Sequence, residues 1–138
     1  MLYSGHFTFD EFGSQNNERH GYFTCVVDAQ NPEQALSKFK ERIRQIRIEE
    51  KDPLFERIAA IYIEDIVEIA ESPNDAVVTR FQSSEGPFPK SQSCALPTSD
   101  TRKIKAYQWV PGSEALEYGA EVKDREGYKE VAPLMQFT

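Results

Sequence analysis

Hydrophobic and polar residues alternate over two early stretches of the chain, and this period of two residues is typical of β-strands with one buried face. The alternation runs over residues 3–10 and returns over residues 22–29. The segment between them, 13–21, is polar with a glycine at each end, which is typical of a turn. The pattern therefore predicts a β-hairpin with a long tip.

After residue 29 the apolar period changes from 2 to about 3.6, the period of an α-helix. Asn31 is placed to cap a helix, Pro32 suits the first helical position, and Gln34 lies three residues beyond the cap, as in a capping box. The apolar residues that follow lie within a stripe about 100° wide: Ala35, Leu36, Phe39, Ile43 and Ile46. We predict one principal amphipathic helix from residue 32 to about residue 49.

The isoleucine-rich segment 54–71 begins with helical spacing and continues with a β-rich run. It predicts a short helical turn and then a strand with an irregularity at Glu64 and Asp65. The acidic residues of this run are expected to point outward from a strand with one wet face: Glu64, Asp65, Glu68 and Glu71. After a turn at 72–75, residues 76–82 predict a strand that pairs back as a hairpin, and residues 104–111 predict a final strand.

Strands gathered around a single helix predict an α+β fold, with a mostly antiparallel sheet of about 4–5 strands and the helix on one face. Residues 1–111 form a single domain in this prediction. It contains a Ser/Pro-rich loop at 83–103, in which we expect a short strand near 93–96. Residues 112–138 are predicted to form a C-terminal arm that packs on the domain or on a partner subunit, because its apolar end is rarely left in water.

The charge balance narrows the possible partners of this small domain. The 138 residues include 23 acidic and 16 basic residues, for a net charge of −7. Such an acidic protein repels phosphate backbones and anionic lipid surfaces, which disfavours nucleic acid as a partner. No apolar run reaches membrane-spanning length and no secretion signal is recognisable, so we expect a cytoplasmic protein with reduced cysteines and no membrane association.

The predicted helix is a local basic island, because its flanks carry five lysine and arginine residues. The basic residues lie on both sides of the apolar stripe, a layout that suits side chains whose stems cover the core edge. Pairing with acidic residues and contact with nucleic acid are the alternatives. The candidate interaction surface combines basic flank residues with apolar residues of the loop and the arm: Lys38, Arg42, Arg44, Arg47, Phe88, Leu134 and Phe137.

The sequence shows no pattern that indicates catalysis. His6 and His20 lack the spacing of metal ligands, although they could meet across the first hairpin. Cys25 shares a face with apolar residues, and Cys94 has no base nearby that would activate its thiol. Serine-nucleophile and glycine-rich phosphate motifs are not found. We therefore expect no catalytic residue, cofactor or metal, and an enzyme is not favoured.

The order of strand, polar turn, strand and then "NPEQALSKFKERI" resembles the small α+β domains of HicB-type antitoxins. The resemblance covers residues 3–46 and is carried by Asn31, Glu33, Ala35 and Leu36. It implies an antitoxin-like regulator associated with nucleic acid. This chain departs from the family pattern in lacking a Pro-Gly-Cys-like segment before the helix.

Three functions follow as hypotheses. The leading one is a non-catalytic protein-interaction module that forms homo-oligomers through the Ser/Pro loop or the C-terminal arm. The second is an antitoxin-like or nucleic-acid-associated regulator that uses the basic flanks of the helix. The third is a small-ligand binder or enzyme whose pocket is lined by tyrosine and phenylalanine, with His6, His20 or Cys94 in it.

Overall fold

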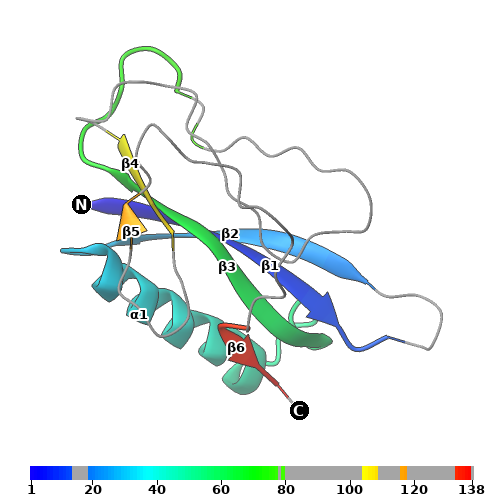
Figure 1. The fold of residues 1–138 in the computed structure, drawn as a ribbon. Helices are drawn as coiled ribbons and strands as arrows, with labels where there is room; N and C mark the ends of the chain where they lie inside the picture. Colours follow the sequence, from blue (N-terminus) through cyan, green and yellow to red (C-terminus); the bar gives the residue numbers. More distant parts are fainter. Residues whose placement is uncertain (14–18, 78, 80–103, 109–115, 118–132, 138) are drawn as a thin grey trace.

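The computed structural model describes residues 1–13, 19–77, 79, 104–108, 116–117 and 133–137. Its elements are β1 (Leu2–Glu11), β2 (His20–Asp28), α1 (Pro32–Arg44), a π-helical turn (Gln45–Glu49), β3 (Ile58–Ile69), β4 (Ile104–Gln108), β5 (Leu116–Glu117) and β6 (Met135–Gln136). The strands form an antiparallel sheet, and α1 lies along one side of it (Figure 1). The α+β class predicted from the sequence is confirmed.

The strands follow the order β2-β1-β3-β4-β5 across the sheet. One edge of β3 pairs with β1 along almost its whole length. Its other edge is shared, because β4 pairs with the last residues of β3 while β6 pairs with Ala60 and Ile61 near its start. Since β5 and β6 hold two residues each, four longer strands form the main part of the sheet.

The start of α1 follows the cap predicted from the sequence. Asn31 Oδ1 accepts a hydrogen bond from the backbone N–H of Gln34 at 2.7 Å, and Pro32 occupies the first turn. Gln34 reaches back with its own side chain, whose Oε1 accepts from the N–H of Gln30 at 2.8 Å. Two of the backbone donors at this end are thereby satisfied.

The other end of the helix differs from the prediction. The α-helical hydrogen bonding stops at Arg44, and the chain continues through one wider, π-helical turn to Glu49. The N–H of Glu50 closes this turn on the carbonyl of Gln45 at 2.8 Å. A pattern of period 3.6 shows which side chains are buried, but it does not show which carbonyl accepts the hydrogen bond of each amide. The predicted end near residue 49 is therefore right, whereas the predicted α-helical bonding of the last turn is wrong.

The core lies between α1 and the sheet, and Gly5 sets how closely the two approach. A Cβ atom on Gly5 would lie 2.8 Å from both Phe39 Cε2 on α1 and Phe7 Cε2 on β1. The two phenylalanine rings meet edge to face with centroids 5.7 Å apart. Phe7 also stacks on Phe23 of β2 at 5.1 Å. The missing side chain at Gly5 thus lets the helix ring lie directly against β1.

A bulge in β3 decides which of its side chains face the helix. Asp65 lies opposite His6 of β1, whereas Phe7, the next residue of β1, lies opposite Ile63. Glu64 is therefore an extra residue, at the position where the sequence predicts an irregularity, and that prediction is confirmed. The extra residue shifts the alternation by one, so that Ile63 and Ile66 both share the face of Phe7 and Gly5.

The expectation that the acidic residues of this strand point outward is wrong for three of them. Glu64, Asp65 and Glu68 are buried, and Glu71, which follows the strand, is exposed. Their burial accompanies the central position of β3, which is flanked by β1 on one edge and by β4 and β6 on the other. A single sequence pattern could not show this, because it does not contain the neighbours of the strand.

Other predicted segments differ in detail. The turn before β3 (53–57) is present without α-helical hydrogen bonding, and Ala76, Val77 and Thr79 are not in a strand. The strand predicted over 104–111 is seen as β4 but is not the last one, because β5 and β6 follow it. The whole Ser/Pro loop (83–103) lies outside the described residues, and with it the strand expected near 93–96 and Phe88. No helix in the described part of the chain is long and apolar enough to cross a membrane.

We predict that Gly5→Ala lowers the free energy of unfolding by about 1–3 kcal/mol, because the added methyl group overlaps two packed rings. Urea denaturation followed by circular dichroism measures the change. Ser37→Ala on the exposed side of α1 is the control and should shift stability by less than about 0.5 kcal/mol. An unchanged midpoint for Gly5→Ala would contradict the close approach of Phe39.

Candidate functional site

The sheet face opposite α1 carries a row of polar side chains, which we call the polar track. It is formed by side chains from the three neighbouring strands β1, β2 and β3: His6, Thr8, Asp10, His20, Tyr62 and Asp65. The sequence alternation places the β1 members on one face. The bulge at Glu64 brings the β3 members to the same face, because it reverses the alternation between Ile63 and Asp65.

One end of the polar track is a buried histidine–aspartate pair. His6 Nδ1 lies 2.5 Å from Asp65 Oδ1, and the two residues are 6% and 1% exposed. A carboxylate held against one ring nitrogen fixes the orientation of an imidazole and leaves Nε2 as its second polar atom. This arrangement can orient a base, but catalysis also needs a nucleophile or substrate within reach of Nε2.

The other end of the polar track is a second pair with a tyrosine beside it. His20 Nδ1 lies 2.7 Å from Asp10 Oδ1, and the hydroxyl of Tyr62 donates to Asp10 Oδ2 at 3.4 Å. His20 lies directly opposite Asp10 in the register of β1 and β2. The hairpin therefore brings this pair together by strand pairing alone.

The two histidines do not meet across the hairpin, and that expectation is wrong. His6 lies four positions from Asp10 along β1, a separation of about 13 Å in a strand. Each imidazole is held by a different aspartate. Among the described residues, no group of three or more histidine, cysteine, aspartate and glutamate side chains could hold a metal ion. The polar track therefore contains two histidine–aspartate pairs, one near each end.

The basic residues of the helix contact their own chain. Lys38 donates to the carbonyl of Asp28 at 2.9 Å, and Arg42 forms a 2.9 Å ion pair with Glu50. Such exposed pairs contribute little to stability. Two of the basic flank residues are thus engaged with other parts of their own chain.

The C-terminal segment brings two members of the candidate interaction surface together. The guanidinium of Arg47 lies 4.9 Å from the ring centre of Phe137, and Arg47 Nε donates to the carbonyl of Ile58 at 3.4 Å. Leu134 and Phe137 are partly buried and pack against the core. Figure 1 shows β6 beside β3, close to the end of the helix. Arg47, Leu134 and Phe137 therefore cover the core of their own chain.

The β2 strand forms an edge of the sheet that sequence reasoning did not identify as a surface. Among the described residues β2 pairs with β1 alone. Its outer face carries Tyr22, which is 68% exposed, and Val26, which is 61% exposed, with the exposed Thr24 between them. The signal in the sequence was the presence of large apolar residues at positions that the alternation places outside.

The direction of the backbone groups along β2 follows from its pairing with β1. Met1 and Ala29 exchange both of their backbone hydrogen bonds, at 2.8 and 2.9 Å. Because hydrogen-bonded pairs recur at every second residue of an antiparallel ladder, the backbone groups of Tyr22, Thr24 and Val26 point away from β1. The exposed side chains and the outward backbone groups of β2 therefore belong to the same three residues.

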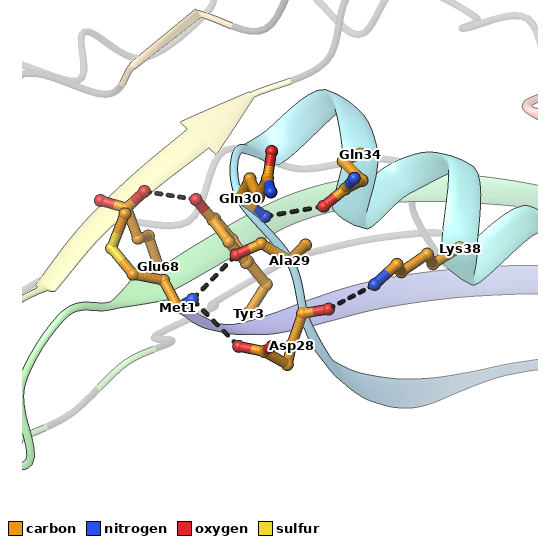
Figure 2. A network of polar contacts seen from close by, with 8 residues as sticks. All are labelled: Met1, Tyr3, Asp28, Ala29, Gln30, Gln34, Lys38 and Glu68. Atoms are coloured by element: carbon orange, nitrogen blue, oxygen red, sulfur yellow. Dashed lines mark hydrogen bonds and ion pairs between the residues drawn. The ribbon is translucent and has the colours of Figure 1, made fainter.

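One end of the β2 edge is held by a network of polar contacts (Figure 2). The amino group of Met1 contacts Asp28 Oδ1 at 3.0 Å and the carbonyl of Ala29 at 2.8 Å. The hydrogen bond from this amino group, together with its charge, lowers the pKa of Asp28. Lys38 donates a hydrogen bond to the outward carbonyl of Asp28. The last outward carbonyl at this end of the edge is therefore already bonded within the chain.

Two groups near the core, one buried and one partly buried, have shifted protonation equilibria. The hydroxyl of Tyr3 donates to Glu68 Oε1 at 2.6 Å, and burial, reinforced by this hydrogen bond and by the charge of Glu68, raises the pKa of Tyr3. Burial also raises the pKa of the Cys25 thiol, an effect that Arg42 partly offsets. A thiol that resists ionisation is a poor nucleophile, so Cys25 acts as a packing residue.

Comparison with known proteins found no matching family model, no similar curated protein and no similar solved structure.

We predict that Asp65→Ala lowers the free energy of unfolding by about 1–3 kcal/mol, because it leaves the buried His6 ring without its hydrogen-bond partner. Urea denaturation at neutral pH measures the loss. Asp75→Ala, which removes an exposed carboxylate, should change stability by less than about 0.5 kcal/mol. Equal stability of the two variants would show that the pair does not hold the polar track.

We predict a loss of stability above about pH 10, where tyrosines of the unfolded chain ionise. Folded Tyr3 keeps its proton to higher pH because its pKa is raised. Its contribution is therefore complete below pH 10 and decreases by up to about 1.4 kcal/mol per pH unit above it, until folded Tyr3 also ionises. Tyr3→Phe should make the decrease shallower in denaturation series from pH 8 to 11. Tyr22→Phe, at an exposed position, should keep the wild-type slope.

Proposed function

We propose that the protein is a non-catalytic interaction protein that associates with itself through the β2 edge of its sheet. The observation that carries this proposal is the coincidence, on one edge strand, of exposed apolar side chains at Tyr22 and Val26 with backbone groups that point away from the sheet. A strand edge of this kind is a template for pairing with another strand.

The composition of β2 supports pairing. Natural proteins protect sheet edges with lysine, proline, bulges or short strands. β2 spans nine residues without lysine or proline, and its register with β1 is continuous. Lys38 contacts only the last carbonyl of the strand, at Asp28. The centre of β2 thus lacks these protective features.

From the sequence we expected self-association through the Ser/Pro loop or the C-terminal arm, whereas the proposal here uses the β2 edge. Residues 133–137 of the arm pack on their own β3, through backbone hydrogen bonds from Leu134 to Ile61 and from Phe137 to Ala59, both 2.7 Å. The Ser/Pro loop lies outside the described residues. Association through β2 needs neither of them.

We predict that the full chain is a dimer in size-exclusion chromatography with light scattering, and that Val26→Lys weakens the dimer at least about tenfold. The substitution removes an apolar contact and adds a charge to the edge, a combined cost of about 1.4 kcal/mol or more. Leu54→Lys, at an exposed turn position, should dimerise like the wild type.

Circular dichroism would verify that both lysine variants are folded. A wild-type monomer at all concentrations up to the millimolar range would refute self-association. Dimerisation of Val26→Lys at wild-type strength would remove β2 from the interface.

A further inference from the structure

We infer that two copies of β2 pair antiparallel about a twofold axis at Thr24, so that the two sheets form one continuous sheet. This inference rests on the self-association proposed above and specifies its geometry. An interface with twofold symmetry must be complementary to itself, because the same residues are used twice. A β2–β2 interface therefore requires the backbone groups and side chains of β2 to be complementary to those of an antiparallel copy of the same strand.

The backbone of β2 is suited to this pairing. The outward groups belong to every second residue, with Thr24 at the midpoint of the strand. With the axis at Thr24, the outward residues of one copy face outward residues of the other, as a hydrogen-bonded antiparallel pair requires. The three central pairs then exchange about six hydrogen bonds, two for each pair. Lys38 lies beyond them, at the last residue of the strand.

The side chains match as well. Thr24 faces the partner's Thr24, and Tyr22 faces the partner's Val26 on both sides of the axis. Pairs of two threonines and of an aromatic with a β-branched residue are among those that stabilise antiparallel sheets. At the ends, His20 lies opposite the partner's Asp28, beyond the three central pairs.

The side chains of β2 on the face toward α1 also pack well in this register. Phe23 and Cys25 are partly buried there and contact the core. With the axis at Thr24, Phe23 lies opposite the partner's Cys25, so a large ring meets a small thiol on each side. The pairing buries apolar surface on this face without placing two rings at one position.

Neighbouring registers are poorer. An axis at Phe23 sets Tyr22 opposite the partner's Thr24, and an axis at Cys25 sets Tyr22 opposite the partner's Asp28. Both lose the contacts between Tyr22 and Val26, and both leave an end of β2 unpaired. Only the axis at Thr24 sets all nine residues of the strand opposite the partner's strand, which favours this register over its neighbours.

Cysteine cross-linking tests the axis directly. Thr24→Cys, made in the full chain with Cys25→Ala and Cys94→Ala, should form an intermolecular disulfide on mild oxidation. The two Cα atoms at the axis would be about 5.5 Å apart, which suits a disulfide. Val26→Cys in the same background is the matched control, because its two copies would be about 13 Å apart. We expect a cross-linked dimer for Thr24→Cys and none for Val26→Cys.

A second measurement needs no substitution. Amide hydrogen exchange of the unmodified chain should slow at Tyr22, Thr24 and Val26 when the concentration is raised from monomer to dimer. If light scattering shows a dimer but these amides exchange unchanged, or Val26→Cys cross-links in place of Thr24→Cys, the inferred register is wrong while self-association stands. If the chain stays monomeric, both the inference and the proposed function fail.

Discussion

The extra residue in β3 is the constraint on which the rest of the structure depends. Side chains on a strand alternate between two faces, and Glu64 shifts that alternation by one position in the central strand. Before the shift Ile63 faces the helix, and after it Ile66 does, so isoleucines continue on the helix-facing side of β3 across the extra residue. The same shift turns Asp65 toward His6. The apolar core and the polar track are therefore consequences of one local irregularity.

This constraint also explains how a charged strand can lie at the centre of the sheet. Buried carboxylates are costly unless they are paired. Asp65 is held by His6 and Glu68 by the hydroxyl of Tyr3, both from β1. β1 thus supplies the polar partners of Asp65 and Glu68 as well as the apolar ring of Phe7. Such satisfied pairs favour one register of the two strands, because a slip of one residue would separate both of them.

Charged and uncharged side chains have different surroundings at the surface of the protein. The basic flanks of α1 looked from the sequence like the most distinctive surface, yet Arg42 pairs with Glu50 and Arg47 covers Phe137. Three uncharged residues of β2 have exposed side chains at the edge of the sheet: Tyr22, Thr24 and Val26. A net negative protein can associate through such a strand, because backbone hydrogen bonds and apolar contacts do not depend on the overall charge.

Local patterns in the sequence determined the first hairpin, the helix with its Asn31 cap, and the irregularity in β3, because each depends on residues close together in the chain. Only the tertiary structure decided that Asp65 and Glu68 are buried, since their partners His6 and Tyr3 are about sixty residues away. The same holds for β2. Its alternation showed that Tyr22 and Val26 point outward, but the order of the strands decided that β2 forms an edge. An edge exists only where pairing stops, and pairing joins segments that are distant in sequence.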